Sequence, residues 1–251
     1  LYGDRLKAVY DKSSGTAPFK AGLNLVDGYL YRKDGYVQDS ESVLENGHKF
    51  IVDWTEGQKT GFFLDQKYNR LAVAKLAKGR RVLDCFTHTG SFALNAAMGG
   101  AEHVTAVDIS ADAVEQTKKN IELNNLSDTV DVVKADVFDF LTELMASKKH
   151  PYDFIILDPP AFTKSSSTVT SAYKGYKDIN YRAMKILPRG GYLATCSCSH
   201  FMTVPLFKKM LFEAAADAGV SLRQIEDRRQ AADHPILWGV PETEYLKFFI
   251  F

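Results

Sequence analysis

The sequence predicts an α/β fold, with a doubly wound, mostly parallel sheet of seven strands and a small β-rich domain before it. From residue 82 to the C-terminus, short apolar runs alternate with longer segments of helical periodicity, as in repeated βα units. The apolar runs are rich in Val and Ile and show little alternation, which is typical of buried parallel strands. Residues 1–58 have a different texture. We therefore predict two domains, residues 1–58 and 59–251.

The N-terminal domain carries hairpin signals. Asp-Gly and Asn-Gly pairs, which tolerate the positive φ values of tight turns, occur at residues 27–28, 34–35 and 46–47. They border apolar segments around residues 23–31, 35–38 and 49–54. These short segments are expected to be strands.

Residues 59–81 are basic, with seven Lys or Arg against one acid, Asp65. An apolar helical pattern within them ends near Gly79, a residue suited to a helix C-terminus. The charges fit a solvated helix face, the usual meaning of such a run, or a surface that faces phosphates.

The larger domain then alternates strands and helices. Strands are predicted at 82–86, 104–108, 130–133, 152–157, 191–197, 221–226 and 244–251. Helices are predicted at 91–98, 111–123, 137–145, 172–187 and 203–218, with a Ser/Thr-rich loop at 163–171. The last strand follows Pro241 without an intervening helix, so we expect an antiparallel hairpin at the edge of the sheet.

The composition limits the class of protein. The 31 basic residues equal the 31 acidic ones, so no global charge attracts nucleic acid. No apolar run approaches the roughly 18 residues that span a bilayer, and the N-terminus lacks signal-peptide character. We predict a cytoplasmic protein without membrane contact. Three cysteines, with no CxxC or HxxxH spacing, indicate reduced thiols and no metal site.

Acidic residues stand at or just beyond the ends of four predicted strands: Asp84, Asp108, Asp136 and Asp158. Because the carboxyl ends of parallel strands meet at one edge of a sheet, these side chains would line one crevice. A single Asp at such a place is more often a helix cap. Four in succession favour a ligand site, since capping would equally allow Ser, Thr or Asn.

The most informative stretch is the end of the strand at 152–157. Its apolar run stops at Asp158-Pro159-Pro160, and Phe162 follows. Prolines cannot donate to a strand ladder, so the carboxylate is held at the strand end before a stiff dipeptide. Taken alone, the stretch fits a simple Pro-Pro turn equally well.

The first strand-end turn, residues 84–90, has one glycine and is not a GxGxxG motif. It therefore fits a nucleoside without a pyrophosphate. Asp108 lies 18 residues beyond Gly90, where an acid accepts hydrogen bonds from ribose hydroxyls. An NAD enzyme would use the same acid, so Asp108 alone does not discriminate.

Seven segments carry a family resemblance: Phe63-Leu64-Asp65-Gln66, Asp84-x-Phe86-x-x-Thr89-Gly90, Val107-Asp108-Ile109-Ser110, Ala135-Asp136-Val137-Phe138, Asp158-Pro159-Pro160-x-Phe162, Gly175-Tyr176-Lys177-Asp178-Ile179-Asn180 and Ser197-Cys198-Ser199. Together they resemble the class I S-adenosylmethionine methyltransferases. More closely, they resemble the bacterial family that methylates C5 of cytosine in large-subunit ribosomal RNA. The resemblance extends from about Thr16 to the C-terminus.

The resemblance implies a Rossmann-like methyltransferase fold, ribosomal RNA as the partner and a homodimer. Family members usually carry an RNA-binding PUA domain, a β-rich central domain and a catalytic domain. This chain starts at Leu1 rather than Met, and we expect it to hold only the last two.

The resemblance also implies roles for individual residues. The methionine end of the cofactor would contact Asp84, Phe86, Thr89 and Gly90, its ribose Asp108 and Ile109, and its adenine Asp136 and Val137. Phe63 and Gln66 would close over the cofactor, and Asp158 would border it. The target base would be framed by Asp158, Pro159, Pro160 and Phe162, with Lys177 as a further substrate contact.

Methylation at C5 of cytosine needs a thiolate that adds at C6, because C5 is a poor nucleophile. Strand alternation places Cys196 and Cys198 on the same side, so spacing alone does not choose between them. The family pattern matches Ser197-Cys198-Ser199 and assigns Cys198 as the nucleophile, with Asp158 stabilising the adduct. Cys196 and Cys85 are then interpreted as small buried apolar residues. Residues 161–191 add six Lys or Arg against one acid, Asp178.

Three alternatives stay open. A methyltransferase for exocyclic amino groups could use Asp-Pro-Pro and an aromatic residue without any cysteine. A non-catalytic RNA-binding or ribosome-assembly protein could keep the pocket without turnover. A nucleotide-dependent oxidoreductase is disfavoured by the missing glycines.

Overall fold

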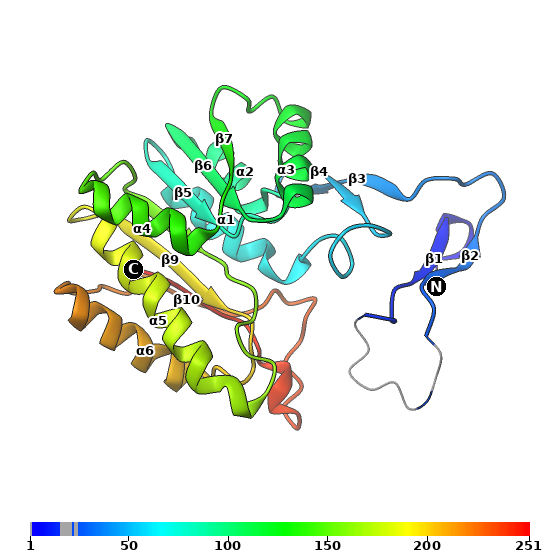
Figure 1. The fold of residues 1–251 in the computed structure, drawn as a ribbon. Coiled ribbons are helices and arrows are strands. Elements are labelled where there is room, and N and C mark those ends of the chain that lie inside the picture. The colour runs from blue at the N-terminus through cyan, green and yellow to red at the C-terminus, as the bar shows by residue number, and fades with distance from the viewer. Residues whose placement is uncertain (1, 16–21, 23–24) are drawn as a thin grey trace. The chain divides into compact units, whose positions relative to one another are not determined.

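The computed structural model describes residues 2–15, 22 and 25–251 (Figure 1). The chain divides into two compact units. The N-terminal unit comprises Leu1–Glu45 with Lys49–Phe63, and the C-terminal unit comprises Asn46–His48 with Leu64–Phe251.

The N-terminal unit contains two pairs of strands. After a short 3-10 turn, Gly3–Arg5, strand β1 (Ala8–Asp11) pairs antiparallel with β2 (Gly28–Arg32). Strand β3 (Ser40–Glu45) pairs with β4 (His48–Asp53). Asn46 and Gly47, both with positive φ, form the turn between them, as the Asn-Gly pair predicts. Residues 35–38 are not a strand, and residues 23 and 24 of the first predicted segment lie outside the described residues.

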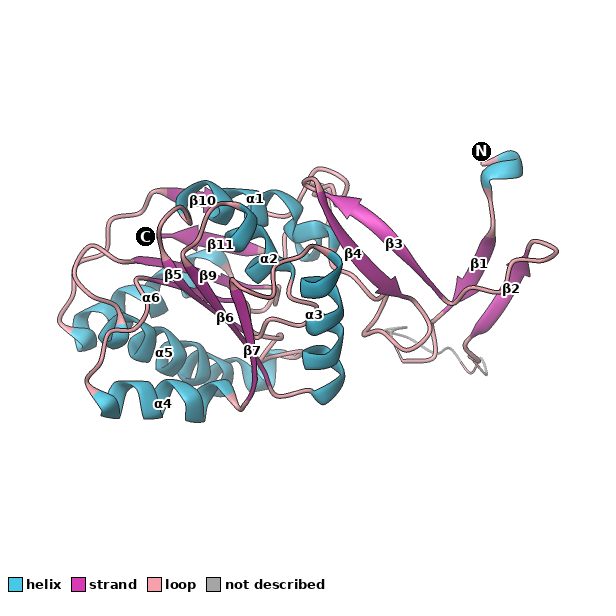
Figure 2. Cartoon of the chain, turned by 90° about the horizontal axis from the view of Figure 1, so that it is seen from above, coloured by secondary structure: helices cyan, strands magenta, loops and turns pink. Residues whose placement is uncertain are grey.

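The C-terminal unit is built on a seven-stranded sheet with the order β10-β11-β9-β8-β5-β6-β7 (Figures 1 and 2). The strands are β5 (Arg81–Cys85), β6 (His103–Asp108), β7 (Val130–Lys134), β8 (Phe154–Leu157), β9 (Tyr192–Ser197), β10 (Glu226–Arg228) and β11 (Lys247–Ile250). Neighbours among β5 to β9 pair in parallel, and β11 runs antiparallel to both β9 and β10.

Six helices cover the two faces of this sheet (Figure 2). On one face α2 (Ser91–Met98) contacts α1 (Lys67–Leu76) and α3 (Ala111–Leu123). On the other, α5 (Val169–Ile186) contacts α4 (Val137–Ser147) and α6 (Val204–Ala218). Short 3-10 turns lie at Leu64–Gln66 (η2), Ser166–Thr168 (η3) and Pro241–Thr243 (η4). The predicted doubly wound, mostly parallel sheet is confirmed.

Several element bounds differ from the predicted ones. The strand predicted at 221–226 forms only at 226–228, because Glu226 pairs with Ile250, the last residue of β11, and earlier residues have no ladder to join. The predicted edge hairpin is confirmed, because β11 pairs antiparallel with β10, the outermost strand. Helix α5 begins at Val169, because η3 leads directly into it, so the Ser/Thr-rich loop is shorter than expected.

The core of the C-terminal unit centres on β8, whose four residues are all fully buried. The strand order reverses between β5 and β8, which pair in parallel. In doubly wound sheets the crevice beyond such a pair of strand ends is the usual ligand site. Within the described residues, no helix is long and apolar enough to span a bilayer.

Candidate functional site

The four strand-end acids lie where the sequence predicts them. Asp84 is the fourth residue of β5, Asp108 ends β6, Asp136 follows β7 and Asp158 directly follows β8. Their charges reach one another, because Asp158 and Asp108 both contribute, after burial, to raising the pKa of Asp84. Three of the four acids therefore share one electrostatic environment.

Asp84 is fully buried, and burial raises its pKa to about 7. Its Oδ2 accepts hydrogen bonds from Thr87 Oγ1 at 2.6 Å and from the Ala93 amide at 3.0 Å. Asp84 Oδ1 and Thr89 Oγ1 are buried and have no hydrogen-bond partner in the described part of the chain. Buried polar atoms are rarely left unsatisfied, so this turn is suited to a polar or cationic ligand group.

The turn after β5 has an unusual backbone. Phe86, His88 and Gly90 have positive φ values of 63°, 53° and 79°, a region that non-glycine residues seldom occupy. The His88 amide donates to Asp108 Oδ2 at 2.9 Å, and Thr117 Oγ1 donates to the His88 carbonyl at 2.9 Å. These bonds fix the turn against β6 and α3. Backbone strain that surrounding hydrogen bonds maintain in this way is common at ligand sites.

Asp108 and Asp136 both bind backbone amides. Asp108 Oδ1 accepts from Ser110 N at 2.9 Å, and the neighbouring Ile109 side chain is exposed. Asp136 caps α4, since its Oδ1 accepts from Phe138 N at 2.7 Å, while Val137 is buried. The capping interpretation therefore holds for Asp136, although a cap leaves its second oxygen available to a ligand.

Asp158 is surrounded by donors. Gln66 Nε2 donates to its Oδ1 at 3.1 Å, and Cys196 Sγ donates to the same atom at 2.9 Å. Burial raises the pKa of Asp158 to about 6, and these two hydrogen bonds act in the opposite direction. Cys196 is buried, as predicted, but its thiol is a hydrogen-bond donor rather than only an apolar filler.

Phe162 lies in a group of aromatic rings. Its centroid is 4.6 Å from Tyr176, 5.9 Å from Phe138 and 6.4 Å from Phe86. The ring is half-buried, so part of it stays accessible for stacking. Between Asp158 and Phe162, Pro159 is buried and Pro160 is exposed.

The segment that follows β9 positions Cys198 between two anchored serines. Ser197 Oγ donates to Tyr176 OH at 3.0 Å, and Ser199 Oγ donates to the Thr163 carbonyl at 2.8 Å. Ser197 and Ser199 are buried, whereas Cys198 is partly accessible. Of the three cysteine thiols, Cys198 is thus the one that solvent or a substrate can reach.

A buried lysine lies beside this segment. Lys247 Nζ donates to the Ser199 carbonyl at 2.5 Å and to the Tyr245 carbonyl at 2.7 Å. Burial lowers the pKa of Lys247 to about 8, and Cys198 acts in the opposite direction. A positive charge near a thiol favours the thiolate.

One predicted site residue of the C-terminal unit, Lys177, is not brought to this group. Lys177 lies on α5 and forms ion pairs with Asp217 at 2.8 Å and Glu213 at 3.5 Å, both on α6. Phe63 belongs to the N-terminal unit, where Lys59 Nζ lies 5.3 Å from its ring centroid. The roles assigned to both residues stay predictions.

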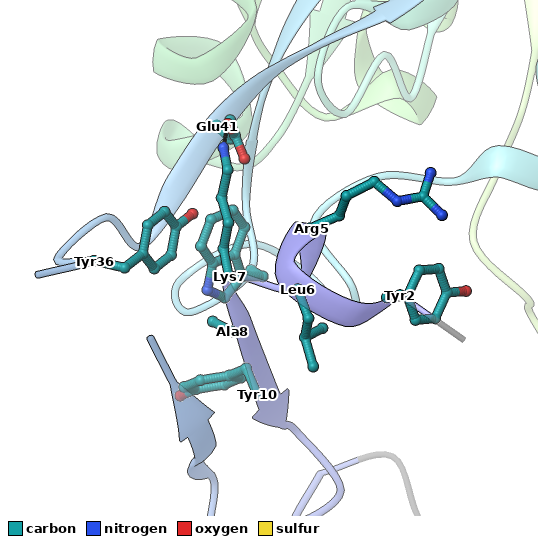
Figure 3. A pocket seen from close by; sticks show the side chains of 9 residues that line it. Tyr2, Arg5, Leu6, Lys7, Ala8, Tyr10, Tyr36 and Glu41 are labelled. Carbon is teal, nitrogen blue, oxygen red and sulfur yellow. Dashed lines mark hydrogen bonds and ion pairs between the residues drawn. The ribbon is translucent and has the colours of Figure 1, made fainter. Parts of the chain in front are cut away.

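The N-terminal unit has a pocket of its own, shown in Figure 3. It has a volume of about 510 Å³, and its lining includes Tyr10, Tyr36 and Trp54. The ammonium of Lys7 in this pocket is bound to Glu41 at 2.6 Å. None of the predicted site residues lines it.

Sequence reasoning missed several contacts of Asp158 and Cys198. Lys247 is an ordinary lysine at the start of a predicted strand, and Asn69 and Arg228, which approach Asp158 through Gln66, carry no motif. The charge of Lys247 within an otherwise apolar terminal run was the one available sequence signal.

The chain is similar to proteins of known family along most of its length. A family model described as S-adenosylmethionine-dependent methyltransferase matches residues 27–248. The proteins named ribosomal RNA large subunit methyltransferase I from Yersinia pseudotuberculosis and Yersinia pestis are each 44% identical over 244 residues. The alignment covers 96% of this chain and 61% of each relative, so the chain spans about three fifths of their length.

Solved structures agree with the sequence comparison. A proposed SAM-dependent methyltransferase from Streptococcus mutans has a TM-score of 0.79 and 29% identity, over 90% of this chain and 58% of that one. A proposed methyltransferase complexed with SAH has a TM-score of 0.76 and 28% identity, over the same shares of the two chains. Family model, relatives and structures agree, and the chain belongs to the S-adenosylmethionine-dependent methyltransferase family.

Proposed function

We propose that the chain transfers a methyl group from S-adenosylmethionine to C5 of a cytosine in large-subunit ribosomal RNA, through a covalent adduct with Cys198. The relatives' names support the class of substrate. The observation that carries the chemistry is the accessible Cys198 thiol, which directly follows the strand that pairs with the Asp158 strand. An enzyme with this substrate would work in the cytoplasm.

The residues of the crevice fit the cofactor. Asp84 Oδ1 and Thr89 Oγ1 are buried and have no partner among the residues that the structure describes, and the methionine part of S-adenosylmethionine brings an ammonium group that donates. Asp108 would accept from the ribose hydroxyls and Asp136, with Val137, would border the adenine. When bound, the cofactor supplies an electrophilic methyl on a sulfonium.

The reaction follows from the thiol and the acid. Cys198 Sγ forms a bond to C6 of the base, which makes C5 nucleophilic. C5 then takes the methyl as the sulfonium–methyl bond breaks and S-adenosylhomocysteine leaves. A base removes the C5 proton, the C5–C6 double bond re-forms and the Sγ–C6 bond breaks. Asp158 would bind the edge of the base and stabilise the adduct, while Phe162 stacks on it.

The test is mass-spectrometric mapping of methylated nucleotides in ribosomal RNA from cells with and without the gene. One cytosine should lose its methyl group when the gene is absent, and regain it with the wild-type gene and with Cys85→Ala, but not with Cys198→Ala. Cys85 is a matched control because it is fully buried in β5. If no cytosine changes mass, the proposal fails.

The donors around Asp158 also support a second candidate, methylation of an exocyclic amino group on a ribosomal RNA base. A carboxylate beside a Pro-Pro segment and an aromatic ring can hold such an amine, and this reaction needs no thiol. Cys198→Ala separates the two candidates, because methyl transfer that survives this change would favour the amino group over C5.

A further inference from the structure

A chain of hydrogen bonds leads from an arginine to Asp158. Arg228 Nε, on β10, donates to Asn69 Oδ1 on α1 at 3.1 Å. Asn69 Nδ2 donates to Gln66 Oε1, in η2, at 2.7 Å. Gln66 Nε2 donates to Asp158 Oδ1 at 3.1 Å. Gln66 and Asn69 are buried, which excludes most water from these bonds.

Chemistry fixes the direction of this chain. A guanidinium has no acceptor, so Asn69 must turn its oxygen to Arg228 and its NH₂ to Gln66. Gln66 must then present its oxygen to Asn69 and its NH₂ to Asp158. Asp158 Oδ1 therefore receives a hydrogen bond, which an ionised carboxylate accepts more strongly than a protonated carboxyl does.

One carboxylate oxygen of Asp158 accepts two hydrogen bonds. Cys196 Sγ donates to Asp158 Oδ1 at 2.9 Å, in addition to the bond from Gln66. No hydrogen bond among the described residues ends on Asp158 Oδ2. The acceptor capacity left over thus lies on Oδ2.

We propose that Arg228, Asn69 and Gln66 are positioning residues that hold Asp158 as an obligate acceptor, so that the site selects a base with an exocyclic amino group over one with a carbonyl there. Cytosine presents N4–H₂ as a donor, whereas uracil presents the O4 acceptor. Two acceptors repel each other, so the chain would favour cytosine over uracil. This inference rests on the proposed cytosine chemistry and gives Gln66 a role toward Asp158 in addition to its predicted contact with the cofactor.

Other charged groups act on Asp158 as well. Burial is the main cause that raises its pKa, and the charge of Asp65 adds to it. The Cys196 and Gln66 hydrogen bonds and the charge of Arg70 lower the pKa. Asp84 faces Asp158 from β5. If the Gln66 side-chain amide were reversed, its hydrogen bond would no longer lower the pKa of Asp158.

Asn69→Asp tests the direction of the chain. The new carboxylate still accepts from Arg228 but has no NH₂ for Gln66 Oε1, so Gln66 should turn and present its oxygen to Asp158. The Asp158 carboxyl should then titrate at higher pH than in the wild type, because both the reversed Gln66 and the new charge at residue 69 raise its pKa; ¹³C NMR measures this, with the resonance assigned through Asp158→Asn. The matched control is Asn124→Asp, at the end of α3, where Nδ2 donates to the Asn120 carbonyl at 2.7 Å.

Selectivity is measured with RNAs that differ only in carrying 5-fluorocytidine or 5-fluorouridine. Fluorine replaces the C5 proton, so after methyl transfer the Cys198 Sγ–C6 bond cannot be eliminated and the protein–RNA adduct accumulates. The wild type should trap the cytidine RNA faster. Asn69→Asp should lower this preference at least tenfold, while Arg228→Lys, which keeps a donor, should stay closer to the wild type than Arg228→Met.

The outcomes separate the two proposals. An unchanged Asp158 titration in a folded Asn69→Asp variant overturns the positioning chain, whatever the reaction. An unchanged preference between the two RNAs also overturns it. A wild type that traps neither RNA, together with a shifted titration in Asn69→Asp, refutes the covalent cytosine chemistry but leaves the hold on Asp158 supported. If Asn69→Asp does not fold, the Arg228→Met titration decides in the same way.

Discussion

Asp84 combines full burial with an oxygen that has no partner among the described residues. Its pKa of about 7 means that the carboxyl holds a proton in mildly acidic solution. The ammonium of the cofactor would favour the ionised form, so a ligand that carries this ammonium must displace the proton below pH 7. Cofactor binding and the ionisation of Asp84 are therefore linked.

We expect the affinity for S-adenosylhomocysteine to fall about tenfold for each pH unit below 7 and to level off above it, since one proton is released per ligand bound. Methylthioadenosine, which lacks the amino acid part, should bind with little dependence on pH. Titration calorimetry from pH 5.5 to 8 measures both. Equal pH profiles for the two ligands would contradict this link.

Asp84 also makes folding stability depend on pH. An unfolded Asp ionises near its ordinary value of 3.8, whereas the folded protein holds the proton to about pH 7. Between these values the folded state binds more protons, so the free energy of unfolding should decrease as pH rises from about 4 to 7. Asp84→Asn should flatten this decrease in urea titrations, and the slope that remains reflects Asp158, whose pKa is also raised, and His88, whose lowered pKa acts in the opposite direction. A wild-type stability that rises over this range would count against the buried acid.

Lys247 supplies a positive charge beside Cys198, and that charge is lost as pH rises through its pKa of about 8. We expect Lys247→Met to slow the alkylation of Cys198 by iodoacetamide about tenfold below pH 8, because the thiolate fraction falls. Above pH 8 the difference should shrink. Mass spectrometry identifies the alkylated cysteine.

The control is Lys208→Met, because Lys208 Nζ contacts the ring of Phe249 on β11 at 5.1 Å and pairs with Asp227 rather than approaching Cys198. Equal alkylation rates for wild type and Lys247→Met at pH 7 would remove Lys247 from the environment of the thiol.

At the scale of elements, periodicity was a good guide wherever a strand or helix has its partners close in the sequence. Helices α2 and α3 have the predicted bounds. The shared position of the acids at the ends of β5, β6 and β8 follows from the parallel pairing of these strands alone. Strand β10 was misplaced because its extent depends on β11, which follows about twenty residues later. The bond between Arg228 and Asn69 joins residues 159 positions apart, and no local pattern encodes such a contact.

Gly90 shows how an element boundary depends on one residue. It caps α2 with φ of 79°, and a Cβ there would lie 2.7 Å from Thr117 Cγ2 and 3.0 Å from Leu94 Cδ1. Gly90→Ala should therefore lower the free energy of unfolding by about 2–4 kcal/mol, from backbone strain and overpacking together. Urea denaturation measures the loss.

Gly79→Ala is the matched control, since Gly79 has a similar φ of 70° but no atom within 4 Å of the added Cβ. This change should cost only about 1 kcal/mol, the strain of the left-handed backbone alone. Equal losses for the two variants would show that the contact with Thr117 has no energetic weight.

For the molecule as a whole, the 31 basic residues equal the 31 acidic ones, and ion pairs reach into the two basic segments. In the segment 161–191, Lys177 pairs with α6 and Arg182 pairs with Asp178 at 2.9 Å. In the segment 59–81, Arg80 pairs with Asp153 and Arg81 with Glu102. Several Lys and Arg side chains that the sequence analysis considered for phosphate contacts are thus already paired with carboxylates.

Under the proposed function, RNA binding should therefore depend only weakly on salt. Each phosphate contact with a single strand contributes about −0.7 to the slope of log K against log salt, and we expect two to four contacts, a slope of about −1.5 to −3. Filter binding between 50 and 300 mM salt measures it. The exposed Lys164 and Lys174, changed together to Gln, should make the slope shallower by about 1.4. Lys177→Gln should leave the slope nearly unchanged, because the carboxylates of α6 already hold that charge. A wild-type slope steeper than about −6 would contradict this expectation. It would require more phosphate contacts than the cations outside these ion pairs are expected to make.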